Sequence, residues 1–196
     1  DFLLAEHKGH LIHPKTPLPV KPWVWRAEFF GAFDTADRAL LEKGWHIAYY
    51  QVSDMYGCPE AVALMKPFHD QLAAHFGLDR RADLFGFSRG GLYAVNYAAA
   101  YPEDLSVLYL DAPVLDIRSW PGGLGEGVGS PGEWEDCKRW YHLTANTARA
   151  FDRNPLDQIP KLIADQIPVV LVAGDSDQVV PYVENGAILH KEYTMR

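Results

Sequence analysis

The chain has 196 residues, 48% of them hydrophobic, and a net charge of −8. This length suits one domain with a sizeable core, and the negative charge argues against a nucleic acid or an anionic membrane as the partner. No run of about 18 apolar residues is present, so no membrane span is expected.

The chain has two cysteines, Cys58 and Cys137. They are too few for a disulfide framework and lack the spacing of a metal site, so we expect no metal and no cofactor. A single bridge between them is one hypothesis, and it would tie the loop at Cys58 to the segment around Cys137. Because the chain begins at Asp1 without a signal-like segment, we expect a processed or truncated start and predict no compartment.

Apolar runs separated by turn residues predict strands that alternate with helices. This alternation predicts a mostly parallel sheet with right-handed crossovers, covered by helices on both faces as a three-layer α/β/α sandwich. The strands are expected at 2–6 and 10–13 (a hairpin turning at Lys8-Gly9), 22–26, 46–52, 81–87, 107–110 and 168–173, the last being the clearest buried strand. The helices are expected at 36–43, 61–76 with a kink at Pro67, 90–101 and 182–196.

One region, from Pro113 to about Asn154, has no strand pattern. Its first part, 121–132, is rich in glycine and predicts a mobile loop. Its second part predicts a helix with Trp134, Cys137 and Tyr141 on one face. An insertion just after the carboxyl end of a strand is where an α/β protein carries a lid, so we expect a lid insertion over about 113–154 within a single domain spanning 1–196.

The motif Gly86-Phe87-Ser88-Arg89-Gly90 fits G-x-S-x-G, the nucleophile elbow. The glycines let the turn between strand and helix close tightly, and the turn presents the serine hydroxyl above the sheet. The apolar run before Ser88 and the helical pattern after it are the context that the motif requires. The alternative is a serine that merely caps the following helix.

A second polar loop, Gly174-Asp175-Ser176-Asp177-Gln178-Val179-Val180-Pro181, directly follows the strand that ends at Ala173. Asp177 and Ser88 are therefore both expected at the carboxyl edge of the sheet. A serine nucleophile needs a base and a third group that orients the base, and Asp177 is a candidate for that third group. The order of serine before acid is that of the α/β hydrolases.

On these two motifs the chain resembles the α/β-hydrolase superfamily, nearer its esterase and prolyl-oligopeptidase-like branches, over nearly its whole length. The resemblance implies an α/β-hydrolase fold, with Ser88 as the nucleophile and Asp177, rather than Asp175, as the acid. It also implies an oxyanion hole made by the N–H of Arg89 and by a second N–H from Arg26 or Ala27.

The family's histidine follows one more strand beyond the acid, whereas the stretch 182–196 reads as a helix and leaves no length for that strand. His190 is the one histidine after the acid, and a helix would carry it about 12 Å away from the acid loop. His142, on the lid, is the other candidate for the base. We therefore expect a chain cut short at its C-terminal end, without the final strand and the loop that bears the histidine.

Aromatic and polar residues suggest where a substrate binds. Trp120, Trp134 and Trp140 lie in or beside the lid, where they would either stack on a sugar ring or aryl acid or form the lid's own small core. Asp54, Tyr56 and Cys58 follow a strand at the active edge and are expected to line the pocket.

For the side chain of Arg26, three roles are open. It could be an ordinary surface charge, an ion-pair partner of Glu28, or a contact for an anionic group of the substrate.

The leading hypothesis is a serine hydrolase that cleaves a carboxylic ester, for example one on a carbohydrate, through an acyl-enzyme on Ser88. A small-molecule or saccharide ester is then the partner. The alternatives are a peptidase of the prolyl-oligopeptidase type and a non-catalytic binding module with the hydrolase fold.

Overall fold

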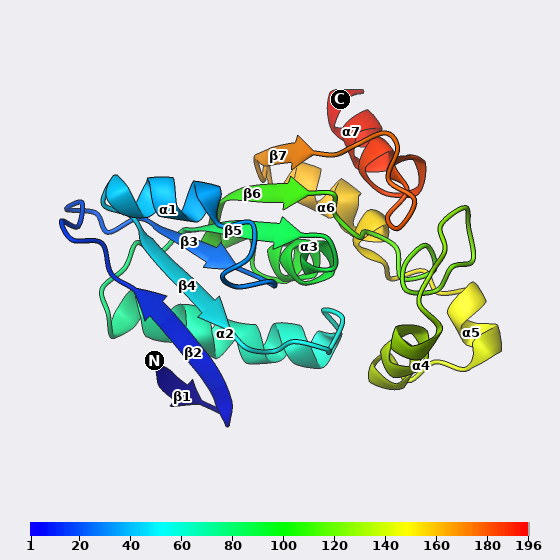
Figure 1. Ribbon diagram of the computed structural model, residues 1–196, viewed down its shortest axis with the longest axis horizontal. Coiled ribbons are helices and arrows are strands. Elements are labelled where there is room, and N and C mark those ends of the chain that lie inside the picture. Colours follow the sequence, from blue (N-terminus) through cyan, green and yellow to red (C-terminus); the bar gives the residue numbers. More distant parts are fainter. Residues whose placement is uncertain (196) are drawn as a thin grey trace.

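The computed structural model describes residues 1–195 and contains one seven-stranded sheet in the order β1-β2-β4-β3-β5-β6-β7 (Figure 1). The first two strands run antiparallel to each other, and β2 runs antiparallel to β4. All other neighbouring pairs are parallel. The strands are β1 (Phe2–Leu4), β2 (His7–Ile12), β3 (Trp23–Arg26), β4 (His46–Tyr50), β5 (Ala82–Phe87), β6 (Leu105–Asp111) and β7 (Val169–Val172).

Helices connect the parallel strands, and further short helices form the region after β6. The α-helices are α1 (Thr35–Glu42), α2 (Pro59–Ala74), α3 (Gly90–Ala100), α4 (Pro131–Trp140), α5 (Ala145–Arg149), α6 (Ile159–Ala164) and α7 (Gly186–Thr194). The 3-10 turns are η1 (Pro102–Asp104), η2 (Pro155–Gln158) and η3 (Tyr182–Glu184). Among the described residues, no helix has both the length and the apolar character needed to cross a membrane.

The two faces of the sheet carry separate hydrophobic cores, because side chains alternate along each strand. Trp23 and Trp25 point into the larger core, which α2 and α3 cover. Val24, between them, points into the smaller core with Phe85, against which Leu40 of α1 packs. The predicted three-layer α/β/α architecture and its mostly parallel sheet are therefore confirmed.

The hairpin at the start of the chain turns at Ala5 and Glu6, which have φ of 47° and 67°, and not at Lys8-Gly9 as predicted. Gly9 has a packing role instead. A Cβ on Gly9 would lie 2.6 Å from the ring of Phe2 and 3.0 Å from the ring of Phe68. Packing between elements far apart in the sequence explains this glycine, and a local turn pattern could not reveal it.

The strand predicted as the clearest buried one is half-exposed. Val170 is 48% exposed and Val172 is 44% exposed, because β7 is the edge strand and is paired only with β6 among residues 1–195. The predicted helix at 182–196 is also divided, into η3 and α7. Asn185 lies between the two parts, and its side chain is buried. Its Oδ1 accepts a hydrogen bond from the N–H of Leu115, and its Nδ2 donates to Pro181 O.

The region predicted as a lid contains α4 and α5 and no strand among the described residues. Figure 1 places both helices beyond the carboxyl ends of β5 and β6. The glycine-rich loop before α4 is compact, since the N–H of Gly122 donates to Ile117 O and the N–H of Ser130 donates to Pro121 O. Asn154 is the N-cap of η2, and Pro155 is its first residue.

Candidate active site

Ser88 lies in the tight turn between β5 and α3, with φ of 49°, a backbone conformation that residues other than glycine seldom adopt. The turn is held by backbone hydrogen bonds on both sides. The N–H of Ser88 donates to Asp111 O at 2.9 Å, and its carbonyl accepts from the N–H groups of Gly91 and Val114. Strain at one residue that the surrounding structure fixes so fully is typical of functional sites.

The glycines around Ser88 are required by space. A Cβ on Gly86 would lie 2.9 Å from Gly90 O, and a Cβ on Gly91 would lie 2.7 Å from the Cβ of Pro113. The first contact lies within the tight turn that the G-x-S-x-G pattern predicts, and the second is with the segment after β6. The alternative role of Ser88 as a helix cap is excluded, because α3 begins after Arg89 without a side-chain cap.

The backbone N–H groups near Ser88 differ in their availability. The N–H of Ala27 donates to Phe85 O at 3.0 Å, which removes Ala27 from the candidates for the oxyanion hole. Arg26 belongs to β3, in register with Tyr49 on one side and with Phe85 on the other.

The next N–H along the chain, that of Glu28, is differently placed. Its nitrogen lies 3.6 Å from the position that a Cβ on Gly90 would occupy, and so beside the start of α3. Within residues 1–195 the N–H groups of Glu28 and Arg89 donate to no acceptor. Glu28 N–H is a donor that sequence reasoning missed, because the pairing of β3 with β5 decides which N–H remains free.

The side chain of Arg89 gathers three carboxylates beside the elbow. Its guanidinium lies 2.9 Å from Glu28, 2.9 Å from Asp54 and 3.3 Å from Glu133, which belong to the loop after β3, the loop after β4 and helix α4. Glu28 is buried, and burial raises the pKa of its carboxyl although Arg89 acts in the opposite direction. Arg89 thus connects the elbow to the loops after β3 and β4 and to helix α4.

Arg26 has none of the three predicted roles. Its side chain is fully buried, and its guanidinium pairs with Asp37 of α1 at 2.7 Å. It also donates to the carbonyls of Phe29 and Ala32. A buried guanidinium needs hydrogen-bond partners. Here α1 and a loop that folds back over Arg26 supply them for the two terminal nitrogens, whereas Nε has no partner among the described residues, and the local sequence does not predict this arrangement.

Asp177 lies on the loop after β7, partly buried, and its Oδ1 accepts from the N–H groups of Val179 and Val180 at 2.9 Å each. In Figure 1 the strands β5, β6 and β7 point toward one edge of the sheet. Backbone pairing links the ends of these strands, because Ala112 donates to Val172 O just as Ser88 donates to Asp111 O. Ser88 and Asp177 therefore follow strands that end at the same edge, as predicted.

Neither candidate histidine lies at this edge in a position to act as a base. His190 is exposed on α7, and the ring of His142 lies 3.3 Å from the carboxylate of Glu60. Within residues 1–195, no histidine side chain is hydrogen-bonded to Ser88 or Asp177.

The four predicted substrate-binding residues have different environments. Asp54 is exposed and pairs with Arg89, as described above. Tyr56 and Trp120 are buried and contact each other, with ring centroids 6.3 Å apart. Trp134 packs on the larger core. Two of the three lid tryptophans, Trp120 and Trp134, therefore contribute to packing, while Trp140 is 38% exposed.

Cys58 and Cys137 are both buried free thiols, so the hypothesis of a bridge between them is wrong. Burial raises the pKa of Cys58 to about 11 and raises that of Cys137 further above its usual range. Both side chains belong to the larger core, where a cysteine packs as a small hydrophobic residue.

One cluster of possible metal ligands, His69, Asp70 and Asp104, has its ligand atoms within 4.8 Å of one another. The ammonium of Lys66 already lies 2.6 Å from Asp70 and 2.9 Å from Asp104, and Tyr97 donates to Asp104. The lysine supplies the positive charge that a metal ion would otherwise bring, so the cluster is a salt-bridge network.

The architecture and the elbow together define the class: the chain has the α/β-hydrolase fold. It matches solved α/β-hydrolase structures across almost its whole length, although no family model and no curated protein matches the sequence. S-formylglutathione hydrolase (FrmB) from Staphylococcus aureus has a TM-score of 0.66 at 13% identity, and the match covers 96% of this chain and 81% of that one.

Two further structures are similar. MPT51 from Mycobacterium tuberculosis has a TM-score of 0.64 at 15% identity, with 96% of this chain and 80% of that chain covered. MGS-MChE2, an alpha/beta hydrolase enzyme from the metagenome of sediments of the Mar Chica lagoon, Morocco, has a TM-score of 0.60 at 19% identity. That match covers 97% of this chain and 83% of the other. At these identities the likeness defines the fold.

Proposed function

We propose that this protein is a serine hydrolase that cleaves carboxylic esters through an acyl-enzyme on Ser88. The observation that carries the proposal is the backbone of Ser88, held at φ of 49° between β5 and α3 by hydrogen bonds to the segment after β6. That turn places a hydroxyl at the carboxyl edge of a parallel sheet, where α/β proteins bind their ligands. The hydrolase structures to which the chain is similar support the same class.

In this proposal the Ser88 oxygen attacks the ester carbonyl, and the N–H groups of Arg89 and Glu28 donate to the oxyanion that forms. The acyl group is then carried on Ser88 as the alcohol leaves, and water releases the acid. Asp177, fixed by two backbone N–H groups, would orient the base that takes the proton of the serine. Because no histidine of residues 1–195 contacts Ser88, the hydroxyl in this chain is weakly activated, and slow turnover is expected.

The side chains around Ser88 bear on which class of ester this site would accept. An ester on a carbohydrate stays the narrower prediction from the sequence, and the exposed ring of Trp140 does not support it, because Trp140 lines a cavity to which Ser88 does not contribute. Beside Ser88, the guanidinium of Arg89 is already shared among three carboxylates. An anionic substrate group would therefore gain little from Arg89, so a neutral ester is favoured.

Two other functions remain as candidates. A non-catalytic binding module is favoured by one observation, the lack of a histidine beside Ser88 in the described part of the chain. A peptidase of the prolyl-oligopeptidase type would use the same nucleophile and acid and differ in its substrate.

Covalent labelling by a fluorophosphonate tests the proposal directly, since the reagent phosphonylates an activated serine. Because Ser88 is weakly activated, we expect slow labelling that rises to one equivalent on Ser88, and slow hydrolysis of a short aryl ester. Ser88→Ala should abolish both. Ser176→Ala is the matched control and should behave like the wild type, because Ser176 is exposed and its hydroxyl donates to Asp175. Absence of labelling and of turnover in the folded wild-type protein would favour the binding module.

A further inference from the structure

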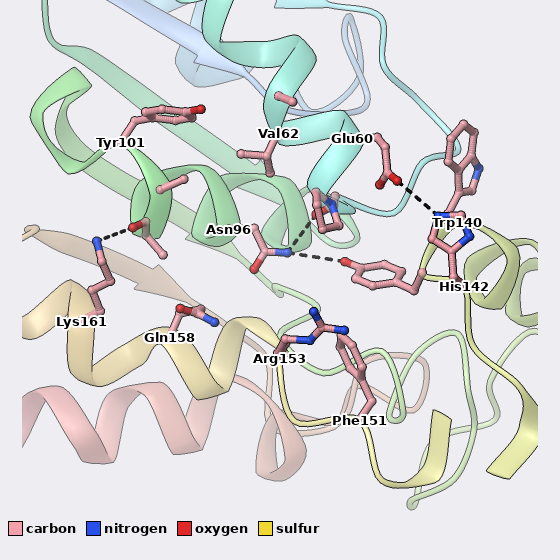
Figure 2. Close-up of a pocket in the computed structure, with 16 residues that line it drawn as sticks. Glu60, Val62, Asn96, Tyr101, Trp140, His142, Phe151, Arg153, Gln158 and Lys161 are labelled. Atoms are coloured by element: carbon pink, nitrogen blue, oxygen red, sulfur yellow. Dashed lines mark hydrogen bonds and ion pairs between the residues drawn. The ribbon is translucent and has the colours of Figure 1, made fainter. Parts of the chain in front are cut away.

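A cavity of about 480 Å³ lies away from the elbow, between the start of α2, the second half of α3, the end of α4 and the segment that includes η2 and α6. Neither Ser88 nor Asp177 is among its lining residues. Its volume is within the range of about 300–1,000 Å³ typical of small-molecule sites. Figure 2 shows that side chains from α2, α3, α6 and the segment around α4 and α5 converge on it.

The body of this cavity is apolar. Val62 of α2, Ala99 of α3 and Phe151 after α5 form its walls, and all three are buried. Small residues keep the space open, because Ala63 and Ala100 also line it and present only methyl groups. An apolar chain or ring that enters would therefore displace water from contact with these apolar side chains.

The wall formed by residues 151–161 is cationic. The guanidinium of Arg153 lies 5.5 Å from the centre of the Phe151 ring, and this contact restricts its orientation. In Figure 2 Arg153 extends toward Asn96, and Lys161 lies on the same wall. Within residues 1–195 Arg153 pairs with no carboxylate, whereas Lys161 pairs with Asp165.

The carboxylate among the lining residues, that of Glu60, is exposed at the rim of the cavity. Glu60 lies 3.3 Å from the ring of His142, on the part of the rim formed by the lid (Figure 2). The amide nitrogen of Asn96 donates to Gly57 O and lies 3.5 Å from the hydroxyl of Tyr141, and that hydroxyl donates to Tyr56 O. On the wall formed by residues 151–161, the charged group that has no carboxylate partner among residues 1–195 is the exposed guanidinium of Arg153.

We propose that this cavity is a binding site for an amphipathic monocarboxylate, a molecule with one carboxylate and a short aliphatic or aryl body. The carboxylate pairs with the guanidinium of Arg153, whose planar fork matches two carboxylate oxygens. The body of the ligand lies over Val62 and Ala99. This inference is independent of the proposed chemistry at Ser88, because it requires only binding.

Titration with octanoate tests the proposal, with octan-1-ol and octylammonium as ligands of the same chain length and different charge. We expect octanoate to bind tightest of the three. In ¹H–¹⁵N NMR spectra, the protein amide signals that shift on adding octanoate should belong to α2, α3 and the segment 151–161. Arg153→Gln should weaken octanoate binding about tenfold and leave octan-1-ol unchanged, since it removes one charge-assisted pair. Arg149→Gln is the matched control, because Arg149 lies outside this cavity and the change in net charge is the same.

A second variant tests the apolar part. Ala63→Phe adds a ring at an exposed position of α2 that lines the cavity, and it should weaken both octanoate and octan-1-ol. The proposal is overturned if octanoate fails to bind or if octylammonium binds as tightly. It is also overturned if Arg153→Gln and Arg149→Gln have equal effects, or if the shifts map to another part of the protein. Equal octanoate binding by Ala63→Phe and the wild type would likewise overturn it.

Discussion

Nε of Arg89 donates to the buried carboxylate of Glu28 at 2.9 Å, so the residue after Ser88 is tied by its side chain to the loop after β3. The two residues that carry this ion pair also carry the two N–H groups proposed for the oxyanion hole. Their backbone groups lie on separate segments of the chain, and the side chains hold these segments together. The pair therefore positions the donors, although neither charge needs to contact the substrate.

This arrangement predicts different effects for the two glutamates that contact Arg89. Glu28→Gln replaces the buried carboxylate by a neutral amide and loosens the loop, so we expect fluorophosphonate labelling of Ser88 to slow about tenfold, less than the loss of a whole oxyanion donor. Glu133→Gln changes a partner that is 38% exposed on the lid and should leave the rate nearly unchanged. Equal rates for both variants would show that the ion pair does not position the donors. Circular dichroism checks that each variant is folded.

The ion pair between Arg26 and Asp37 leads to a prediction about stability. Both side chains are buried, so Arg26→Gln leaves Asp37 without its partner and should lower the free energy of unfolding by about 3–5 kcal/mol. Arg38→Gln is the matched control, since Arg38 pairs with Asp34 on the surface and is 76% exposed. Urea denaturation should show a clear loss for the first variant and almost none for the second. Similar midpoints for both would refute a structural role for Arg26.

The order of strands and helices and the two loops that carry Ser88 and Asp177 could be predicted from the sequence. Both motifs are local. The glycines two residues before and two residues after Ser88 indicate, from the sequence alone, a turn too tight for larger side chains. The loop after β7 is also local, because the carboxylate of Asp177 accepts from Val179 and Val180, two and three residues along the chain.

Features that depend on contacts between distant segments were not predictable. The pairing of β3 with β5 occupies the N–H of Ala27 and leaves that of Glu28 free. Arg26 pairs with Asp37 only because α1 packs back on the sheet, and Gly9 is required by the rings of two phenylalanines. A half-exposed β7 follows from its place at the edge of the sheet, which an apolar run of four or five residues does not reveal.

Two glycines allow a test of the packing behind the elbow. A methyl group on Gly91 would lie 2.7 Å from the Cβ of Pro113 and 2.8 Å from Val114 O, so Gly91→Ala should lower the free energy of unfolding by about 1–3 kcal/mol. Gly132 lies in α4 with nothing within 4 Å of the same position. Gly132→Ala should therefore leave stability unchanged or raise it slightly, because alanine restricts the unfolded chain. Thermal denaturation of both variants checks this, and a neutral Gly91→Ala would contradict the close packing of α3 against the segment after β6.

The free thiols predict how stability depends on pH. Burial raises the pKa of Cys58 in the folded protein from 9.0 to about 11, so the folded state holds this proton more tightly than the unfolded state does. The contribution of Cys58 is therefore fully present below about pH 9 and is lost as the pH rises from about 9 to about 11. Cys58→Ala should lose less stability over that interval than the wild type in urea denaturation at each pH, and parallel curves would contradict a buried, protonated thiol.

Intact mass under non-reducing conditions should show two thiols, and both should react with a thiol reagent at pH 8 only after unfolding, because a buried thiol stays protonated and inert.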